Sequence, residues 1–474
     1  MQPALDSADR AGASSTQRLA RSVAAYAVLV GLPAALVLLV LHAGAGLPAA
    51  TGVAAPAAAS GSSAFDLGRL VAQIVVIVGA ARLLGALARR VGQPRVVGEM
   101  AAGLLLGPSA LGLAAPGVAR ALFPPESLGF VNSLAQVGVL LFMFVVGIDL
   151  DLAELRRRGH AALVTSHASI IAPLLLGSAL ALLLYGRYAP AGVPFASFAL
   201  FMGAAMSVTA FPVLARILEE RGMTGSPLGI VAIACAAIDD VTAWCILAAV
   251  VLVARAEGAA PLLATLAGTA AYLVVMFTAG RALLARLAAR AARDEAGIEG
   301  FLAVVMLLAL GSAWVTEWIG VHALFGAFLV GALLPKSSPA VAALTSRLRD
   351  LMVVLLLPLF FAFTGLRTTL TLISGAQAWA LCLLVLLVAV AGKLGGSALA
   401  ARVSGMSWRD ALSLGALMNT RGLMELVILN VGLDIGVLSP PLFAMMVVMA
   451  LVTTALTTPL LNSLQDGRKI AHAR

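Results

Sequence analysis

Long apolar runs recur along the whole chain, and they constrain its fold more than any other feature. A helix needs about 20 apolar residues to cross the hydrocarbon core of a membrane, and runs of this length follow one another through the sequence. Charged residues make up 11% of the 474 residues, and the mean hydropathy is +1.04. Soluble domains carry about a quarter charged residues. The pattern predicts an all-α polytopic membrane protein rather than the short alternating segments of a β-barrel.

The apolar runs predict fourteen membrane-spanning helices. Their approximate limits are 22–42, 66–88, 96–113, 128–148, 160–185, 195–218, 227–255, 261–282, 298–318, 320–335, 350–368, 375–401, 410–432 and 441–463.

The basic residues orient these helices in the membrane. With the amino terminus in the cytoplasm, most Lys and Arg fall on cytoplasmic connections, as the positive-inside rule requires. The net charge of +9 is thus accounted for by orientation, and we expect no nucleic-acid partner. The arginines expected at the outer side are Arg69, Arg120, Arg187, Arg255 and Arg367.

The two ends of the chain differ in composition from the rest. Residues 1–64 are expected to hold a cytoplasmic tail, one extra N-terminal helix and an uncharged external linker. This segment also resembles a signal peptide, but its apolar run of about 20 residues is long for one and favours a retained anchor helix. Residues 65–463 would form the transmembrane domain, and residues 464–474 a short cytoplasmic tail without a regulatory domain.

The spans after the first helix number thirteen and divide into six, one and six. The single span at 261–282 would place the two groups of six spans, at 66–255 and 298–463, in opposite orientations in the membrane. Inverted repeats of this kind are typical of secondary transporters, whose binding sites lie in broken helices near the membrane midplane.

Sequence signals for a broken helix occur in the fifth span of each group of six spans. The first has Thr209 three residues before Pro212 in "MSVTAFPVLARIL", and the second has Asn419–Gly422 in "ALMNTRGLMELVIL". Proline removes a backbone donor, and Gly and polar side chains lower the cost of unwinding. A proline kink and a structural polar patch are the alternative interpretation, but the matching positions favour a pair of crossing broken helices.

Two adjacent acids, Asp239 and Asp240, lie in the middle of the span at 227–255. Ionisable residues inside a membrane are costly and indicate function. Neighbours on a helix point about 100° apart, so the two carboxylates face different partners. Lys393 is the one lysine within a span, and a buried lysine can lose its proton whereas arginine stays charged. We therefore expect a Lys–Asp pair that forms and breaks with proton movement; a plain helix bridge is the alternative.

The other polar residues within spans include possible cation ligands and structural contacts. Thr209 and Ser207 would offer hydroxyl or carbonyl oxygens to an alkali cation, or would only cap and back-bond their helix. Arg421 and Glu425, four residues apart, are expected to form a structural ion pair. Glu99 is expected either to contact a helix end or to line the ion pathway. His322 is expected to be a structural histidine. No nucleophile–base set or metal-ligand set occurs, so we expect neither an enzyme nor a cofactor.

Six motifs in order resemble the monovalent cation:proton antiporter-2 family, and most of all its branch of plant cation/proton exchangers. They are "VGEMAAGLLLGPSALG", "SVTAFPVLARIL", "AAIDDVTAW", "GVHALFGAFLVGALLP", "LPLFFAFTGLRTTL" and "LMNTRGLMELVILNVG", within residues 66–463. The resemblance implies a thirteen-helix antiporter fold, in which a six-helix core moves against a dimerising scaffold, in a multi-pass protein of the bacterial inner membrane.

The resemblance also implies roles for single residues. Asp240 would bind the cation and the proton in turn, and Asp239 would pair with Lys393. The broken-helix threonine falls on Thr209 and the basic residue of the second broken helix on Arg421. Many plant members carry Asn at the first acidic position; Asp239 instead follows the two-aspartate pattern associated with electrogenic exchange.

These observations predict exchange of Na⁺ or K⁺ for H⁺ by alternating access. Carboxylate and carbonyl cages for the two cations differ only by small geometric adjustments, so the sequence leaves Na⁺ and K⁺ as alternatives. A sodium-coupled organic anion symporter with the same inverted-repeat plan is the alternative, and a channel or a membrane sensor is a third possibility. The acid pair opposite a membrane lysine argues for the exchanger.

Overall fold

A computed structural model describes residues 24–48, 50, 66–149, 159–223, 225–255, 259–291, 297–320 and 323–471. Within these ranges every regular element is a helix. Ten helices are long and apolar enough to cross a membrane, and the remaining apolar helices are shorter. The all-helical, multi-pass architecture expected from the apolar runs is therefore present.

Apart from the short α6, which lies between two predicted spans, the helices up to residue 255 fall largely in the ranges predicted from the apolar runs. They are α2 (Leu32–Gly44, after the π-turn η1, Ala27–Gly31), α3 (Leu67–Arg90), α4 (Arg95–Leu106), α5 (Leu111–Ala114), α6 (Pro116–Leu122), α7 (Leu128–Asp149), α9 (Gly159–Tyr188), α10 (Phe195–Ser207), α11 (Phe211–Glu220) and α12 (Pro227–Arg255).

The helices after residue 258 complete the bundle. They are α13 (Ala259–Val275), α14 (Arg281–Ala291), α15 (Gly297–Ile319), α16 (Ala323–Leu333), α17 (Pro339–Leu351), α18 (Leu357–Leu366), α19 (Gly375–Val390), α20 (Gly396–Val403), α21 (Trp408–Met418), α22 (Leu423–Asp434) and α23 (Pro440–Ala471). Single π-turns join α13 to α14, α17 to α18 and α19 to α20.

Several helices differ from the predicted limits. The α14 helix continues to Ala291, beyond the expected end at 282, and α17 begins at Pro339, before the expected start at 350. The span expected at 96–113 ends its first helix at Leu106, because the chain turns extended at Gly107 before the short α5. At the carboxyl end, α23 continues as a helix to Ala471, through most of the segment expected to be a tail.

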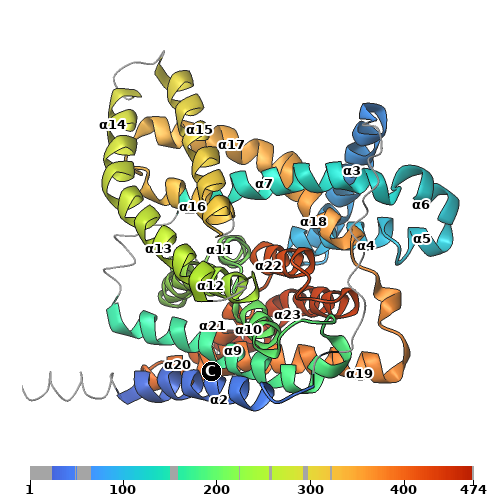
Figure 1. Cartoon of the computed structure of the whole chain (residues 1–474). Coiled ribbons are helices and arrows are strands. Elements are labelled where there is room, and N and C mark those ends of the chain that lie inside the picture. The colour runs from blue at the N-terminus through green and yellow to red at the C-terminus, as the bar shows by residue number, and fades with distance from the viewer. Residues whose placement is uncertain are drawn as a thin grey trace, which may run out of the picture.

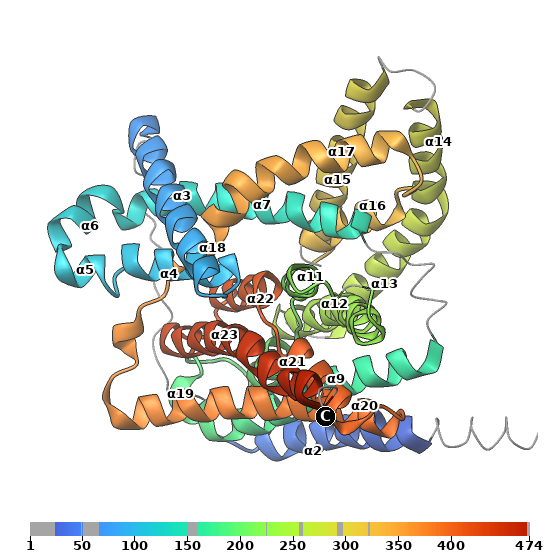
Figure 2. The same ribbon diagram turned by 180° about the vertical axis from the view of Figure 1, so that it is seen from behind.

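The helices are arranged in two layers (Figure 1). We call α3, α4, α7, α16, α17 and α18 the upper layer, and α9, α10, α12 and α19 to α23 the lower layer, with α22 on the side nearest the upper layer. The reverse view keeps this arrangement, and it places α13, α14 and α15 at one end (Figure 2). The layers meet chiefly where α18 lies beside α22 and α4 beside α23.

Glycines let helices of the upper layer approach each other closely. A Cβ atom on Gly147 of α7 would lie 2.1 Å from the carbonyl oxygen of Phe328, and one on Gly331 of α16 would lie 2.0 Å from that of Phe144. Small residues at helix contacts are the usual way in which membrane helices gain packing energy. The α7–α16 contact therefore depends on these two glycines.

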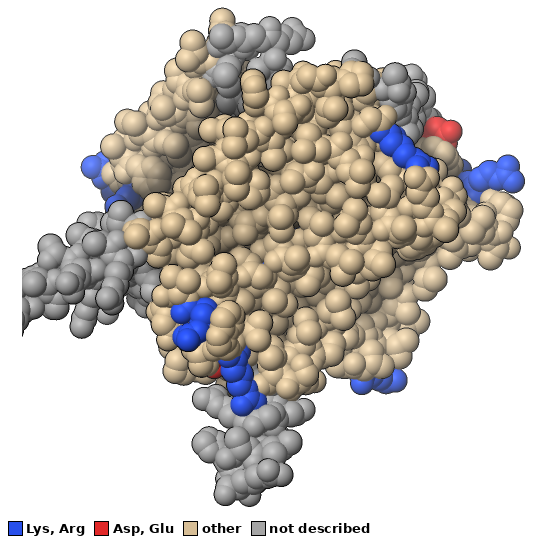
Figure 3. Space-filling model, turned by 90° about the horizontal axis from the view of Figure 1, so that it is seen from below, with Lys and Arg blue, Asp and Glu red and all other residues tan. Residues whose placement is uncertain are grey.

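The lower layer presents a broad apolar face. Seen directly in Figure 3, the middle of this face shows no Lys, Arg, Asp or Glu among the described residues, and the blue basic groups lie near its margins. The helix α2 packs on α9 at this side, where Leu38 and Leu39 remain largely exposed. A face of this composition suits contact with lipid.

Candidate ion-binding site

Both predicted helix interruptions are present, and they meet in the lower layer. The first lies between α10 and α11 at residues 208–210, and the second between α21 and α22 at residues 419–422. The amide of Ala210 donates to the carbonyl oxygen of Thr420 at 3.0 Å, which joins the two unwound segments directly. Pro212 falls in the first turn of α11, where a missing amide hydrogen costs nothing. The local sequence thus explains why the chain unwinds here.

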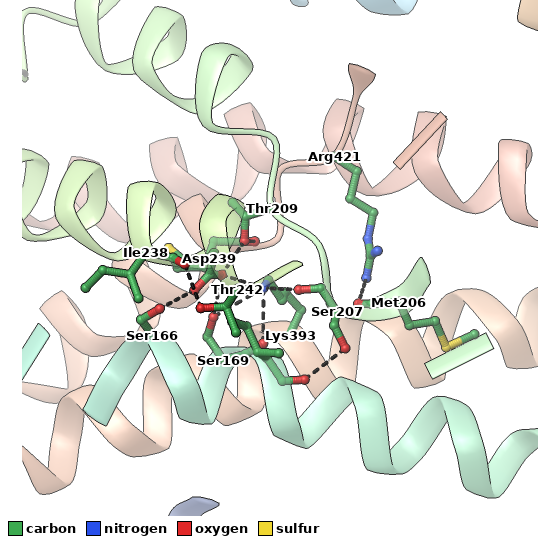
Figure 4. Close-up of polar contacts among 12 residues, drawn as sticks. Ser166, Ser169, Met206, Ser207, Thr209, Ile238, Asp239, Thr242, Lys393 and Arg421 are labelled. Atoms are coloured by element: carbon green, nitrogen blue, oxygen red, sulfur yellow. Dashed lines mark hydrogen bonds and ion pairs between the residues drawn. The ribbon is translucent and has the colours of Figure 1, made fainter. Parts of the chain in front are cut away.

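Asp239 is completely buried beside this crossing and accepts four hydrogen bonds. Ser166 donates to its Oδ1 at 2.5 Å. Ser169 and Thr209 each donate to its Oδ2 at 2.8 Å. The ammonium of Lys393 lies 2.8 Å from the same Oδ2. Figure 4 shows these side chains converging from α9, α12, the first interruption and the lysine-bearing turn.

Lys393 is also completely buried, and it lies in the π-turn between α19 and α20. Besides Asp239, its ammonium donates to the carbonyl oxygens of Ser207 at 2.5 Å and Ser169 at 3.1 Å. The three N–H groups thus have three close oxygen acceptors, which is what a charged amine needs away from water. Asp239 and Lys393, expected from the sequence to pair, are in direct contact.

The hydroxyl groups of Ser207, at the end of α10, and of Thr209, in the first interruption, make different contacts. The Thr209 hydroxyl contacts Asp239 and also lies 3.2 Å from the carbonyl oxygen of Met418, in the facing helix. The Ser207 hydroxyl donates to Gly203 and Ile170 carbonyl oxygens at 2.7 and 2.9 Å. The bond to Gly203, four positions earlier, is the back-bonding that was the alternative expected for Ser207. The Ser207 carbonyl oxygen, and not its hydroxyl, accepts a hydrogen bond from Lys393.

Arg421 caps the carboxyl end of the half-helix α10. Its guanidinium donates to the carbonyl oxygens of Ala205 at 3.2 Å and Met206 at 2.8 Å, and Figure 4 shows it reaching toward Met206. It also pairs with Glu425 at 3.1 Å, and both side chains are fully buried. The last carbonyls of a helix have no partner within it and carry partial negative charge. Arg421 and Lys393 together thus compensate the partial negative charge at the carboxyl end of α10.

Three predicted residues remain, and the side chains of two of them fall outside the described structure. Asp240 follows Asp239 in α12, but its side chain lies outside the described part of the structure, as does the whole of His322. Glu99 is buried in α4, where its Cγ lies near Gly85 of α3.

Ser166 and Ser169 are site residues that the sequence interpretation missed. Three positions apart on α9, they share one helix face and both donate to Asp239. The polar stretch "TSHAS" within an otherwise apolar span was the available signal.

The arrangement holds a carboxylate and an ammonium as a neutral, hydrogen-bonded pair at the crossing of two broken helices. Proton loss from Lys393 or protonation of Asp239 would remove the attraction between them, so the cluster responds to proton movement. The hydroxyls and carbonyls around it are hard oxygen ligands, the type that alkali cations bind.

The chain is similar to known membrane exchangers over most of its length. Residues 74–463 match the family model for the transmembrane part of the sodium/hydrogen exchangers. The chain is 43% identical to the Na⁺/H⁺ antiporter NhaS4 of Synechocystis sp., over 82% of this chain and 96% of that protein. It is 41% identical to the cation/H⁺ antiporter 19 of Arabidopsis thaliana, over 84% of this chain and 49% of the relative, so it spans about half of the plant protein.

The fold has a counterpart among solved structures. The sodium proton antiporter MjNhaP1 of Methanocaldococcus jannaschii superposes with a TM-score of 0.58 at 15% identity, over 84% of this chain and 98% of that one. These similarities do not favour the organic anion symporter. From the family match and the identity to NhaS4, the chain belongs to the sodium/hydrogen exchanger family of membrane antiporters.

Proposed function

We propose that this protein exchanges a monovalent cation, Na⁺ or K⁺, for H⁺ at the crossing of its two broken helices. The observation that carries the proposal is the buried Asp239–Lys393 pair, at 2.8 Å, beside the unwound Thr209 segment. Maintaining two charges inside a membrane protein is costly, which supports a role in moving charge. Exchange of this kind would serve pH and alkali-cation homeostasis.

In this mechanism Asp240 is the residue for which the cation and the proton compete. Asp239 is already engaged by three hydroxyl groups and Lys393, so we assign the transported ion to the next residue in the sequence, Asp240. A protonated Asp240 is neutral and crosses without a cation. Cation binding releases that proton, and Thr209 and nearby carbonyls complete the cage.

Alternating access in this proposal is a movement of the lower layer against the upper layer. We propose that the chain after α2 forms thirteen membrane spans, arranged as two inverted six-helix repeats around one linker, with the broken helices α10–α11 and α21–α22 in matching positions. We further propose a homodimer in the bacterial inner membrane, with the amino terminus in the cytoplasm.

The test uses everted vesicles and a pH-sensitive dye. Asp240→Asn should abolish proton movement driven by Na⁺ or K⁺, and Asp66→Asn, at an exposed helix cap, should retain it. Cation-driven proton movement at the parental rate in Asp240→Asn would refute the assignment. Transport of Na⁺ and of K⁺ is then measured in proteoliposomes, with and without a clamped membrane potential. These measurements identify the transported cation and the net charge moved per cycle.

A further inference from the structure

A second polar cluster, remote from Asp239, connects the two layers. Arg367, just after α18, donates from Nη1 to Oδ1 of Asn430 at 3.0 Å and from Nη2 to Oδ1 of Asp434 at 2.7 Å. Asn430 donates from Nδ2 to the hydroxyl of Thr364 at 3.1 Å. We call Thr364, Arg367, Asn430 and Asp434 the outer cluster, since the distribution of basic residues places Arg367 at the outer side.

Burial in the outer cluster falls steadily from one end to the other. Thr364 is completely buried and Asn430 is 4% exposed, whereas the side chains of Arg367 and Asp434 are 22% and 37% exposed. The contact thus begins inside the protein and ends at its surface. A buried amide that loses its partner costs about 1–3 kcal/mol, so the inner part of the cluster resists opening unless water enters.

The helices that carry the cluster belong to different layers. The α18 helix packs against α4 and α7 in the upper layer, with Gly365 against the backbone of α4. The α22 helix starts immediately after Arg421 and Gly422, at the ion site, and ends at Asp434. Any displacement of the broken helix therefore moves Asn430 and Asp434 relative to Thr364 and Arg367.

A different contact joins the layers near the cytoplasmic end of α3. There the side-chain amide of Gln93 donates to the carbonyl oxygen of Ala455 in α23 at 3.3 Å. This is one long neutral hydrogen bond, whereas the outer cluster contains a short charged one and two others. Charge-assisted hydrogen bonds are roughly twice as strong as neutral ones. Of these two contacts between the layers, the outer cluster is therefore the stronger.

We propose that the outer cluster is a latch that closes the outer face and opens once in each exchange cycle. This inference rests on the exchange activity proposed above. Arg367 is a positioning residue in it, since it acts on the ion site through α22 and touches no transported ion. Closing the latch holds the site away from the outer solution, and opening it lets the lower layer move.

A reversible cross-link tests whether the latch must open. Thr364→Cys and Asn430→Cys would be combined in a protein whose native Cys235, Cys245 and Cys382 are replaced by Ser. Oxidation should stop cation/proton exchange in proteoliposomes, and reduction should restore it. The matched control is Ser109→Cys with Thr368→Cys, because the Ser109 hydroxyl contacts the Thr368 carbonyl at 2.7 Å within the upper layer.

Four outcomes of the cross-linking experiment have defined meanings. Loss of exchange in the latch pair but not in the control supports the proposal. Exchange at the parental rate in fully cross-linked latch protein overturns it, and so does a latch pair that stays reduced while the control pair oxidises. A parental protein that exchanges no cation instead refutes the proposed function, so the two failures are distinguishable.

Charge variants test the role of Arg367 independently. Arg367→Gln and Asp434→Asn should each lower the half-saturating concentration of outer cation by about two- to fivefold, because a weaker latch leaves the outer-open state more populated. The double variant should have the same half-saturating concentration as the single variants. Exchanging the two charges, with Arg367→Asp and Asp434→Arg together, should bring this concentration back toward the parental value. Unchanged values, or shifts that add in the double variant, would contradict the latch.

Discussion

Asp239 accepts hydrogen bonds from four partners that come from three separate parts of the chain. Ser166 and Ser169 lie on α9, Thr209 lies in the first interruption, and Lys393 lies in the π-turn after α19. Losing one member of a buried ion pair is more damaging than losing both, because the remaining charge stays buried without compensation.

This asymmetry leads to a prediction for the pair. Lys393→Met alone should destabilise the protein by about 3–5 kcal/mol, and adding Asp239→Asn should recover a large part of that loss. Thermal unfolding in detergent would measure both, with Lys336→Met as a control for replacing a lysine outside the cluster. Equal destabilisation in the single and the double variant would show that the two side chains do not stabilise each other.

At the scale of single elements, the half-helix α10 depends on cations from other elements. Arg421 reaches the carbonyls of Ala205 and Met206 with two nitrogens, whereas the single ammonium of a lysine lacks this planar fork. Arg421→Lys should therefore lower stability by about 2 kcal/mol, comparable to the loss of a charged hydrogen bond. Arg402→Lys, at an exposed helix end with one carbonyl contact, is the matched control and should have little effect. Thermal unfolding of both variants would check this.

Packing between α7 and α16 gives a second prediction at this scale. Gly331→Ala would push a methyl group against the backbone of Phe144, and overpacking of this kind costs about 1–3 kcal/mol. Gly311→Ala, in α15 with open space at its Cβ position, should be neutral or slightly stabilising. Thermal midpoints in detergent compare the two, and an unaffected Gly331→Ala would mean that the two helices separate without penalty.

At the scale of the whole molecule, α2 lies outside the region that matches the exchanger family. The family match starts at residue 74, and α2 contacts α9 and α10 from the lipid side, near a hydrogen bond of 3.0 Å between Tyr26 and His167. Deleting residues 1–62 should leave a folded protein that still exchanges cations, with a lower thermal midpoint because α9 loses a neighbour. Size-exclusion profiles and exchange rates check this. Complete loss of folded protein would make α2 part of the essential core.

The sequence predicted those parts of the fold that depend on local chemistry. Pro212 and the run from Asn419 to Gly422 mark both interruptions, because they change backbone preference where they stand. Asp239 and Lys393 could be matched because charges are rare inside spans. Ser166 and Ser169 were missed, since serine in a membrane helix commonly bonds its own backbone and gives no sign of a distant partner.

Contacts between surfaces of different helices were beyond the reach of the sequence. Arg367 was expected at the outer side, but its pairing with Asp434 depends on how α18 and α22 lie against each other. The end of α4 at Leu106 was also missed, because the apolar run continues past the turn at Gly107.

The order in which the chain is synthesised gives the Asp239–Lys393 pair a consequence for biogenesis. The two residues are separated by 154 positions, so α12 enters the membrane long before its lysine has been made. During that interval the carboxylate must stay protonated or remain in contact with water, since an ionised acid without a partner is costly in lipid. The ion site of the first half of the protein is therefore incomplete until α19 and α20 are inserted.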